Sequence, residues 1–251
     1  MPLFTKTKLH RVRQVELFIP CFIDQLFPQT AVNMVKVLRK AGCEVHYNTE
    51  QTCCGQPAFN SGFWDEARDV ALKSMADLNT GRMVVSPSGS CVGYFRNGCG
   101  EMLKGTPEHA PYLKFKDNVF EFSEFLVNIL GVTDFGARLN GRATYHDACG
   151  ALRECKIKTA PRALLANVQG LELKEMNECE TCCGFGGTFA VKFEPISVAM
   201  AEQKVDNAME TQADFLVSTD WSCLMHLQGY IKRYGKGIQA MHIADVLASG
   251  W

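Results

Sequence analysis

Two groups of four cysteines with matching spacing are the residues in this sequence best suited to chemistry. Each group contains a Cys-Cys-Gly motif, with one further cysteine upstream and one downstream. The upstream gap is 31 residues in one group and 32 in the other, and the downstream gap is 36 and 39. The groups are Cys21, Cys53, Cys54 and Cys91, and then Cys149, Cys182, Cys183 and Cys223. Four sulfurs brought together twice predict two metal-cluster sites.

The residues around the last cysteine of each group indicate an internal duplication. A serine-rich segment that ends in Cys91 follows Val84-Val85, and a similar one that ends in Cys223 follows Leu216-Val217. Repeats of this size are whole structural units rather than solenoid repeats. We therefore expect two related half-domains, covering residues 1–138 and 139–251.

Composition and charge exclude several classes of protein. The chain has 251 residues with 47% hydrophobic content, which is enough for a sizeable core. Its net charge is −1 and its basic residues are dispersed, which does not favour a nucleic-acid-binding surface. No apolar run approaches the roughly 20 residues that span a bilayer. Lys6, Lys8 and Arg11 precede an apolar stretch, Val15–Ile23, that is short and contains Glu16, so we expect a first strand rather than a leader. The expected location is cytoplasmic.

The interpretation of the twelve cysteines depends on the expected compartment, which is reducing. In such a compartment, metal binding or redox catalysis is favoured over structural disulfides. Adjacent cysteines such as Cys53 and Cys54 are also poor crosslinks, because they close almost no loop. A tetrahedral zinc site is the alternative for four cysteines, in one half or in both.

Alternation of short apolar runs with amphipathic stretches predicts an α/β fold, with a small parallel sheet flanked by helices in each half. The predicted strands are Val15–Pro20, Glu44–Tyr47, Met83–Val85, Ala143–Tyr145, Leu171–Glu175 and Phe215–Ser218. The predicted helices span residues 29–41, 62–79, 159–168 and 195–212. The glycine- and proline-containing segment Asn97–Lys116 is expected to be an inserted surface loop, and residues near 131–141 to link the halves.

The predicted strands place the cysteines at one end of each sheet. Every cysteine of the two groups follows a predicted strand by a few residues, and ligand sites in parallel sheets gather at the carboxyl ends of the strands. Iron–sulfur clusters need such converging thiolates. Backbone N–H groups of the glycine- and serine-rich segments can then donate to cluster sulfurs. The expected cofactor-contacting residues are Gly55, Gly184, Gly186, Gly187, Ser90 and Ser222.

The duplicated motif resembles the cysteine-rich "CCG" domain family, which includes the B subunit of heterodisulfide reductase and the iron–sulfur subunit of glycolate oxidase. The segments Cys53–Gly62 and Cys182–Phe189, with no ferredoxin segment attached, are most similar to the lactate utilization protein A branch. The resemblance implies a non-flavin redox subunit of a cytoplasmic complex that oxidises L-lactate to pyruvate. It also implies [4Fe–4S] clusters, one in each half, and two partners: a ferredoxin-type iron–sulfur protein and a third small subunit.

One departure from the heterodisulfide reductase pattern bears on the chemistry. That enzyme has a fifth cysteine in each half, where this chain has Tyr94 and His226. Four cysteines per half suffice for an ordinary cluster, so the departure disfavours disulfide reduction, which stays an alternative together with a zinc-binding scaffold. His226 can serve as a fifth ligand through nitrogen, and His146-Asp147 can orient a ligand or pass a proton. Free cysteines are commonly buried as small apolar residues, which is the expectation for Cys43, Cys99, Cys155 and Cys179.

Overall fold

The chain folds into two similar halves, each built on a four-stranded parallel sheet. The computed structural model describes residues 13–251; residues 1–12, which include Lys6, Lys8, Arg11 and the start of the first predicted half, lie outside the described residues. The strand order is β2-β1-β3-β4 in one sheet and β6-β5-β7-β8 in the other. The predicted α/β class with two pseudo-symmetric half-domains is confirmed. The boundary itself, between residues 138 and 139, stays a prediction.

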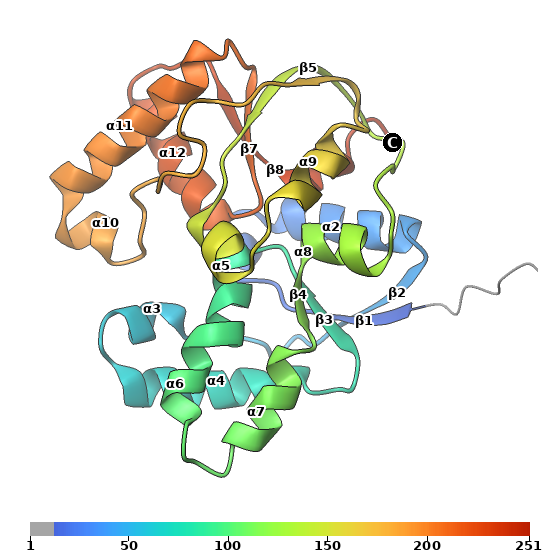
Figure 1. Ribbon diagram of the computed structural model, residues 1–251, viewed down its shortest axis with the longest axis vertical. Helices are drawn as coiled ribbons and strands as arrows, with labels where there is room; N and C mark the ends of the chain where they lie inside the picture. The colour runs from blue at the N-terminus through green and yellow to red at the C-terminus, as the bar shows by residue number, and fades with distance from the viewer. Residues whose placement is uncertain (1–12) are drawn as a thin grey trace, which may run out of the picture.

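The first half contains four strands with helices between them (Figure 1). Its strands are β1 (Arg13–Leu17), β2 (Cys43–Tyr47), β3 (Met83–Ser86) and β4 (Val119–Glu121). Its α-helices are α1 (Cys21–Leu26), α2 (Pro28–Lys40), α3 (Gln56–Asn60), α4 (Trp64–Leu78), α5 (Gly89–Gly93), α6 (Cys99–Leu103), α7 (His109–Lys116) and α8 (Phe122–Glu124). Two π-helical turns follow α5 and α8, η1 (Tyr94–Gly98) and η2 (Phe125–Ile129).

The second half repeats the order of strands with fewer helices. Its strands are β5 (Arg138–Tyr145), β6 (Gln169–Leu173), β7 (Phe215–Ser218) and β8 (Gln239–His242). Its helices are the π-helical turn η3 (Gly150–Glu154) and the α-helices α9 (Thr159–Leu165), α10 (Phe189–Lys192), α11 (Glu194–Glu210), α12 (Trp221–Arg233) and α13 (Ile243–Leu247).

Matching backbone contacts fix the equivalence of the two halves. The amide of Phe18, just after β1, donates to the carbonyl of Val85 in β3 at 3.1 Å. In the second half the amide of His146, just after β5, donates to the carbonyl of Val217 in β7 at 2.8 Å. Phe18 and His146 each lie three residues before the first cysteine of their half, so they occupy equivalent positions.

The structure extends the sequence prediction in one respect and corrects it in another. Each sheet has a fourth strand, β4 or β8, that the prediction lacked. The predicted surface loop Asn97–Lys116 is wrong, because the segment forms the end of η1 together with α6 and α7, and it buries Tyr112 and Phe115. Its glycines permit close packing rather than a loop: a Cβ on Gly98 would lie 2.6 Å from the ring of Tyr94.

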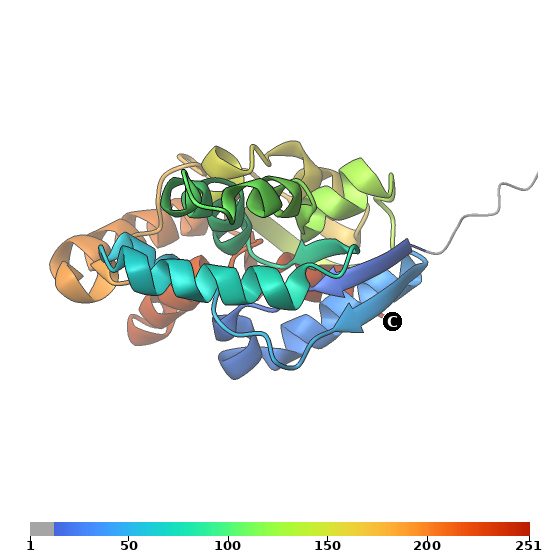
Figure 2. The same cartoon turned by 90° about the horizontal axis from the view of Figure 1, so that it is seen from below.

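The two halves share one packed interface. Glycines let α5 of the first half approach η3 of the second, since a Cβ on Gly89 would lie 2.5 Å from the Cβ of Ala151. On another side Phe27 stacks on Trp221 with ring centroids 3.6 Å apart. In Figure 1, α5 lies between the halves, and Figure 2 shows α4 running along the near side of the first half. The relative position of the halves is therefore determined by direct packing.

The cysteines follow strands at the point in each sheet where the strand order reverses. Cys21 follows β1 and Cys91 follows β3, and these two strands are neighbours from which the chain winds in opposite directions. Cys149 and Cys223 have the same relation to β5 and β7. Loops diverge at such a switch point and leave a crevice for a ligand. No helix in the described part of the chain has the length and apolar character needed to cross a membrane.

Candidate metal centre

All eight predicted ligand cysteines line one cavity between the two halves. The cavity has a volume of about 500 Å³, and its walls include the cysteine-bearing loops of both halves. Gln56 and Pro57 of α3 contribute to one side and Thr188 to the other. The two cysteine groups therefore face the same space rather than opposite ends of the molecule, which the sequence could not indicate.

The first group forms a row of neighbouring thiols. Sγ of Cys54 lies 3.5 Å from Sγ of Cys91, and the thiol of Cys53 lies close enough to those of Cys21 and Cys54 to shift its pKa. The amide nitrogen of Gly55 lies 3.5 Å from Sγ of Cys53. Cys54 and Cys91 are buried, whereas Cys21 and Cys53 are partly exposed. The row therefore has a buried end and an open end.

The second group repeats this arrangement. The thiol of Cys182 lies close enough to those of Cys149 and Cys183 to shift its pKa, and Cys183 stands in the same relation to Cys223. The amide nitrogen of Gly184 lies 3.4 Å from Sγ of Cys182. Again the inner pair is buried and the outer pair is partly exposed. Two independent segments of sequence thus produce the same geometry.

The thiols perturb one another's pKa values strongly. Hydrogen bonds from Cys21 and Cys54 lower the pKa of Cys53 to about 2. The contact with Cys53 and burial raise the pKa of Cys21 above its usual range. One thiolate in a row is therefore stable, but further ionisation places like charges side by side in a buried site. A bound cation would relieve that repulsion, and metal binding releases the remaining protons.

The spread of the sulfurs indicates how large an occupant each group could hold. Among the described residues, just one set of three donor side chains has its atoms mutually within 4.8 Å: His146, Cys183 and Cys223. A single tetrahedral ion needs donors about 3.3–3.8 Å apart, given metal–ligand bonds of about 2.0–2.3 Å. The row from Cys21 to Cys91 lacks even a compact triplet, so it fits an occupant of several atoms better than one ion.

The predicted glycines serve the backbone of the site. Gly55 and Gly184 have φ values of +97° and +93°, which glycine adopts readily, and each amide lies near a cysteine sulfur. The space at Gly184 is filled by helix α11, because a Cβ would lie 2.6 Å from the carbonyl of Ser197. Gly186 and Gly187 line the cavity. Packing and positive φ, in addition to any approach to a cofactor, therefore require glycine after the cysteine pair.

The predicted serines lie on the cavity wall, but their amides are used within the protein. The amide of Ser90 donates to Asp220 at 2.8 Å, and the amide of Ser222 donates to the other oxygen of Asp220 at 3.1 Å. Both serines line the cavity. The Ser90 amide was expected to donate to a cluster sulfur, but it already donates to the carboxylate of Asp220. Asp220 was not singled out from the sequence.

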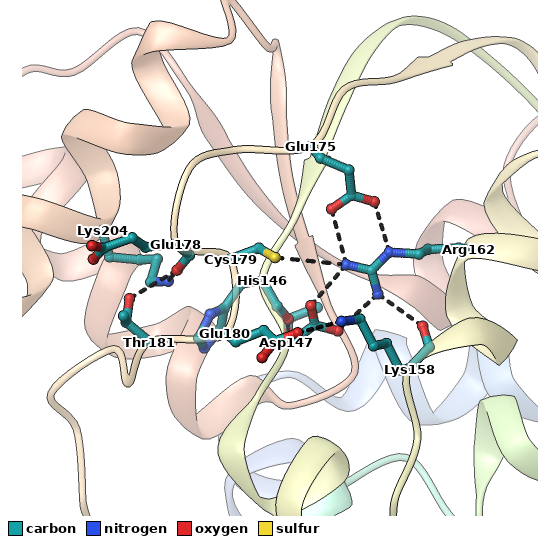
Figure 3. Close-up of polar contacts among 11 residues, drawn as sticks. His146, Asp147, Lys158, Arg162, Glu175, Glu178, Cys179, Glu180, Thr181 and Lys204 are labelled. Atoms are coloured by element: carbon teal, nitrogen blue, oxygen red, sulfur yellow. Dashed lines mark hydrogen bonds and ion pairs between the residues drawn. The ribbon is translucent and has the colours of Figure 1, made fainter.

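A charged network holds the loop that carries Cys182 (Figure 3). Arg162 donates to both oxygens of the buried Asp147 at 2.8 and 2.7 Å, and to Glu175 at 2.6 and 2.9 Å. The amide of Asp147 also donates to the carbonyl of Cys179 at 3.1 Å. Bidentate pairs of this kind fix geometry as well as contributing energy. Asp147 thus ties the end of β5 to the segment that leads into the second cysteine pair.

The candidate fifth ligands lie away from the cavity wall. Nε2 of His226 is 3.2 Å from the hydroxyl of Ser197, and His226 lines a separate, smaller pocket. Tyr94 is buried below Gly55. His146, in contrast, lies beside the inner pair Cys183 and Cys223. Its position three residues before Cys149 was the available sequence signal.

The remaining cysteines lie outside the rows. Three of them are buried, as expected for small apolar residues, and the fourth is partly exposed. The buried residues are Cys43, Cys99 and Cys155, and the partly exposed one is Cys179. None of the four lines the cavity. All twelve cysteines of the chain are free thiols.

Comparison with known proteins defines the class. The model of the cysteine-rich domain family (CCG) matches residues 15–96 and 143–228, one match in each half. The chain therefore belongs to the cysteine-rich CCG domain family. Within that family its relatives are lactate utilization proteins: it is 42% identical over 237 residues to lactate utilization protein A of Bacillus cytotoxicus, covering 94% of this chain and 99% of that protein. It is 40% identical over 238 residues to lactate utilization protein A 2 of Bacillus cereus, covering 94% of this chain and 98% of the relative.

A solved structure shares the fold. A hypothetical protein from Helicobacter pylori superposes with a TM-score of 0.60 at 13% identity. The match covers 95% of this chain, which spans 49% of the length of the Helicobacter protein. At this identity the similarity concerns the fold alone.

Proposed function

We propose that the protein is an iron–sulfur electron-transfer subunit of a complex that oxidises L-lactate to pyruvate. The observation that carries the proposal is the opening of two equivalent rows of four thiols onto one cavity. Electron transfer between cofactors requires them to be close, and a shared cavity brings two sites together. The relatives named for lactate utilization support the choice of substrate.

The donor set fits iron–sulfur clusters. The proposed ligands are the four cysteines of each row, and the neighbouring amides of Gly55 and Gly184 are the groups placed to donate to ligand sulfur. The proposed cofactor-contacting residues are Gly55, Gly184, Gly186, Gly187, Ser90 and Ser222. Bound clusters would each accept one electron, and the conversion of lactate to pyruvate releases two electrons and two protons.

The proposed partners are a ferredoxin-type iron–sulfur protein, which would exchange the electrons, and a third small subunit. We place the protein in the cytoplasm, a reducing compartment in which cysteines serve metal binding rather than structural disulfides. This chain would contribute the ligand thiols and the amide donors. It would act as the non-flavin redox subunit of the complex.

A zinc site in the second half is a second candidate. The compact triplet of His146, Cys183 and Cys223 favours it, because such a set can hold a single ion. Disulfide reduction gains no comparable support, since neither Tyr94 nor His226 lines the cavity with the cysteines.

Metal analysis of protein purified without oxygen tests the proposal. We expect about eight iron atoms and as many sulfides per chain, four at each site, and a brown colour that bleaches on reduction with dithionite. Colourless protein with stoichiometric zinc and no sulfide would select the zinc scaffold. Protein that contains no metal at all, although it was prepared anaerobically, would contradict both candidates.

A further inference from the structure

His146 is a fully buried histidine whose polar atoms have no hydrogen-bond partner. It follows β5 directly, and its relative exposure is 0%. Neither Nδ1 nor Nε2 makes a hydrogen bond of normal geometry in the described structure, and the polar group that lies beside the ring is the thiol of Cys223. A buried polar group without a partner destabilises the folded state, so such groups in native proteins call for an explanation, of which a bound ion is one.

The surroundings of the ring supply that explanation. A ligand atom of His146 and the sulfurs of Cys183 and Cys223 all lie within 4.8 Å of one another. His146 does not itself line the cavity, whereas Cys183 and Cys223 do. The imidazole therefore lies on the buried side of the inner cysteine pair. Imidazole nitrogen and thiolate sulfur are both ligands of iron and zinc.

The first half offers an internal comparison. The equivalent position there is Phe18, which makes the matching backbone hydrogen bond after β1. Phe18 has no donor atom, and its ring packs edge-on against Phe95 with centroids 5.1 Å apart. Among the described residues, the first half therefore offers only thiol donors near this position, whereas the second half adds a nitrogen. The two halves share the backbone at this position but differ in the side chain that it carries.

We infer that His146 is a metal ligand of the second site, through one ring nitrogen, to metal bound beside Cys183 and Cys223. The inference rests on the proposed metal binding by the cysteine rows and makes the two sites chemically unequal. The first site has sulfur ligands only. The second has four sulfurs and one nitrogen, and the nitrogen enters from the protein interior.

The test is a measurement of nitrogen coordination in the second site alone. Cys54→Ser is used as the background so that the first site is removed, and histidine is labelled with ¹⁵N. X-ray absorption at the metal edge should show a nitrogen at about 2.0–2.1 Å. For a paramagnetic cluster, electron paramagnetic resonance should show strong ¹⁵N hyperfine coupling. Both signals should disappear in His146→Phe, which copies the first half, and persist in the matched control His226→Phe.

The outcomes separate this inference from the proposed function. Iron and sulfide without a nitrogen ligand in the unmutated second site would overturn the role of His146 and leave the electron-transfer proposal intact. Weak coupling of the kind a hydrogen bond gives would also overturn it. The second site could instead contain zinc with a nitrogen ligand that disappears in His146→Phe. That result would support His146 as a ligand and would contradict an iron–sulfur cluster in that half. A second site that binds no metal overturns the inference outright.

A gain-of-ligand variant guards against misfolding of His146→Phe. Phe18→His places an imidazole at the position of the first half that is equivalent to His146. In a Cys183→Ser background, metal in the first site should acquire a nitrogen ligand that the parent lacks. The nitrogen ligand is looked for first in Cys54→Ser protein with His146 intact, so that measurement does not depend on whether His146→Phe or Phe18→His folds.

Discussion

The carboxylate of Asp220 accepts a hydrogen bond from the backbone amide of Ser90 at 2.8 Å, although the two residues belong to different halves of the chain. Asp220 is also the N-cap residue directly before α12, and its side chain accepts a hydrogen bond from the amide of Ser222. Its counterpart in the first half is Ser88, which caps α5 and lies 3.3 Å from the same carboxylate. The two helix starts that follow β3 and β7 are thus joined beside both cysteine rows.

Asp220→Ala should loosen this junction. The variant loses the cap of α12 and a charged acceptor buried between the halves, so we expect the free energy of unfolding to fall by about 3 kcal/mol. Asp220→Asn should lose less, because its amide oxygen still accepts from Ser222. Urea denaturation of the metal-free proteins measures both. Equal stability of Asp220→Ala and wild type would show that the junction is not supported by this carboxylate.

Cys54→Ser and Cys183→Ser should each abolish metal binding in one half. Both residues are the buried inner members of their rows, and serine is a poor ligand for iron. Each variant should keep about half of the iron and sulfide of the parent protein, four atoms of each by the stoichiometry of a [4Fe–4S] cluster. Cys43→Ser is the matched control, since Cys43 is buried but remote from the cavity. Full retention of iron in Cys54→Ser or Cys183→Ser would exclude that cysteine as a ligand.

Two glycines of one loop should differ in their tolerance of alanine. Gly184 has a φ of +93° and its Cβ would lie 2.6 Å from the carbonyl of Ser197, so Gly184→Ala should cost about 3 kcal/mol or more in stability. Gly187 has a φ of +63° but open space around it, so Gly187→Ala should cost about 1–2 kcal/mol. Thermal and urea unfolding compare the two variants. A larger loss in Gly187→Ala would contradict the packing of Gly184 against α11.

Glu121 should make the stability of the protein depend on pH. Burial raises the pKa of its carboxyl group from 4.5 to about 7. Between these two values the folded state holds a proton that the unfolded state has released. The free energy of unfolding should therefore fall as the pH rises through this window, by about 3 kcal/mol, and stay lower above pH 7.

Glu121→Gln isolates this contribution. The amide carbonyl can still accept from the amides of Ser123 and Glu124, but it carries no charge at any pH. The variant should match wild type near pH 4.5 and exceed it in stability by about 3 kcal/mol at pH 8. Urea unfolding at both pH values gives the difference, with the exposed Glu101→Gln as control. A constant difference across the pH range would contradict the raised pKa.

Much of the fold could be predicted because it depends on local patterns. Apolar runs placed six strands correctly to within a few residues at their ends, and amphipathic periodicity placed α2, α4, α9 and α11. The prediction failed for residues 97–116, where glycine was interpreted as a loop signal. There the absence of a Cβ serves packing inside helices, as at Gly98, and a local pattern does not distinguish the two uses.

The sequence by itself determined the duplication, the two cysteine rows and the end of each sheet at which they gather, because spacing along the chain and strand polarity suffice for these. Only the tertiary structure decided that both rows open onto one cavity, that Asp220 reaches Ser90, and that His146 rather than His226 lies beside Cys183. These relations depend on how two halves pack and on which way a buried side chain points. Both depend on contacts between residues far apart in the chain, and local sequence patterns do not predict such contacts.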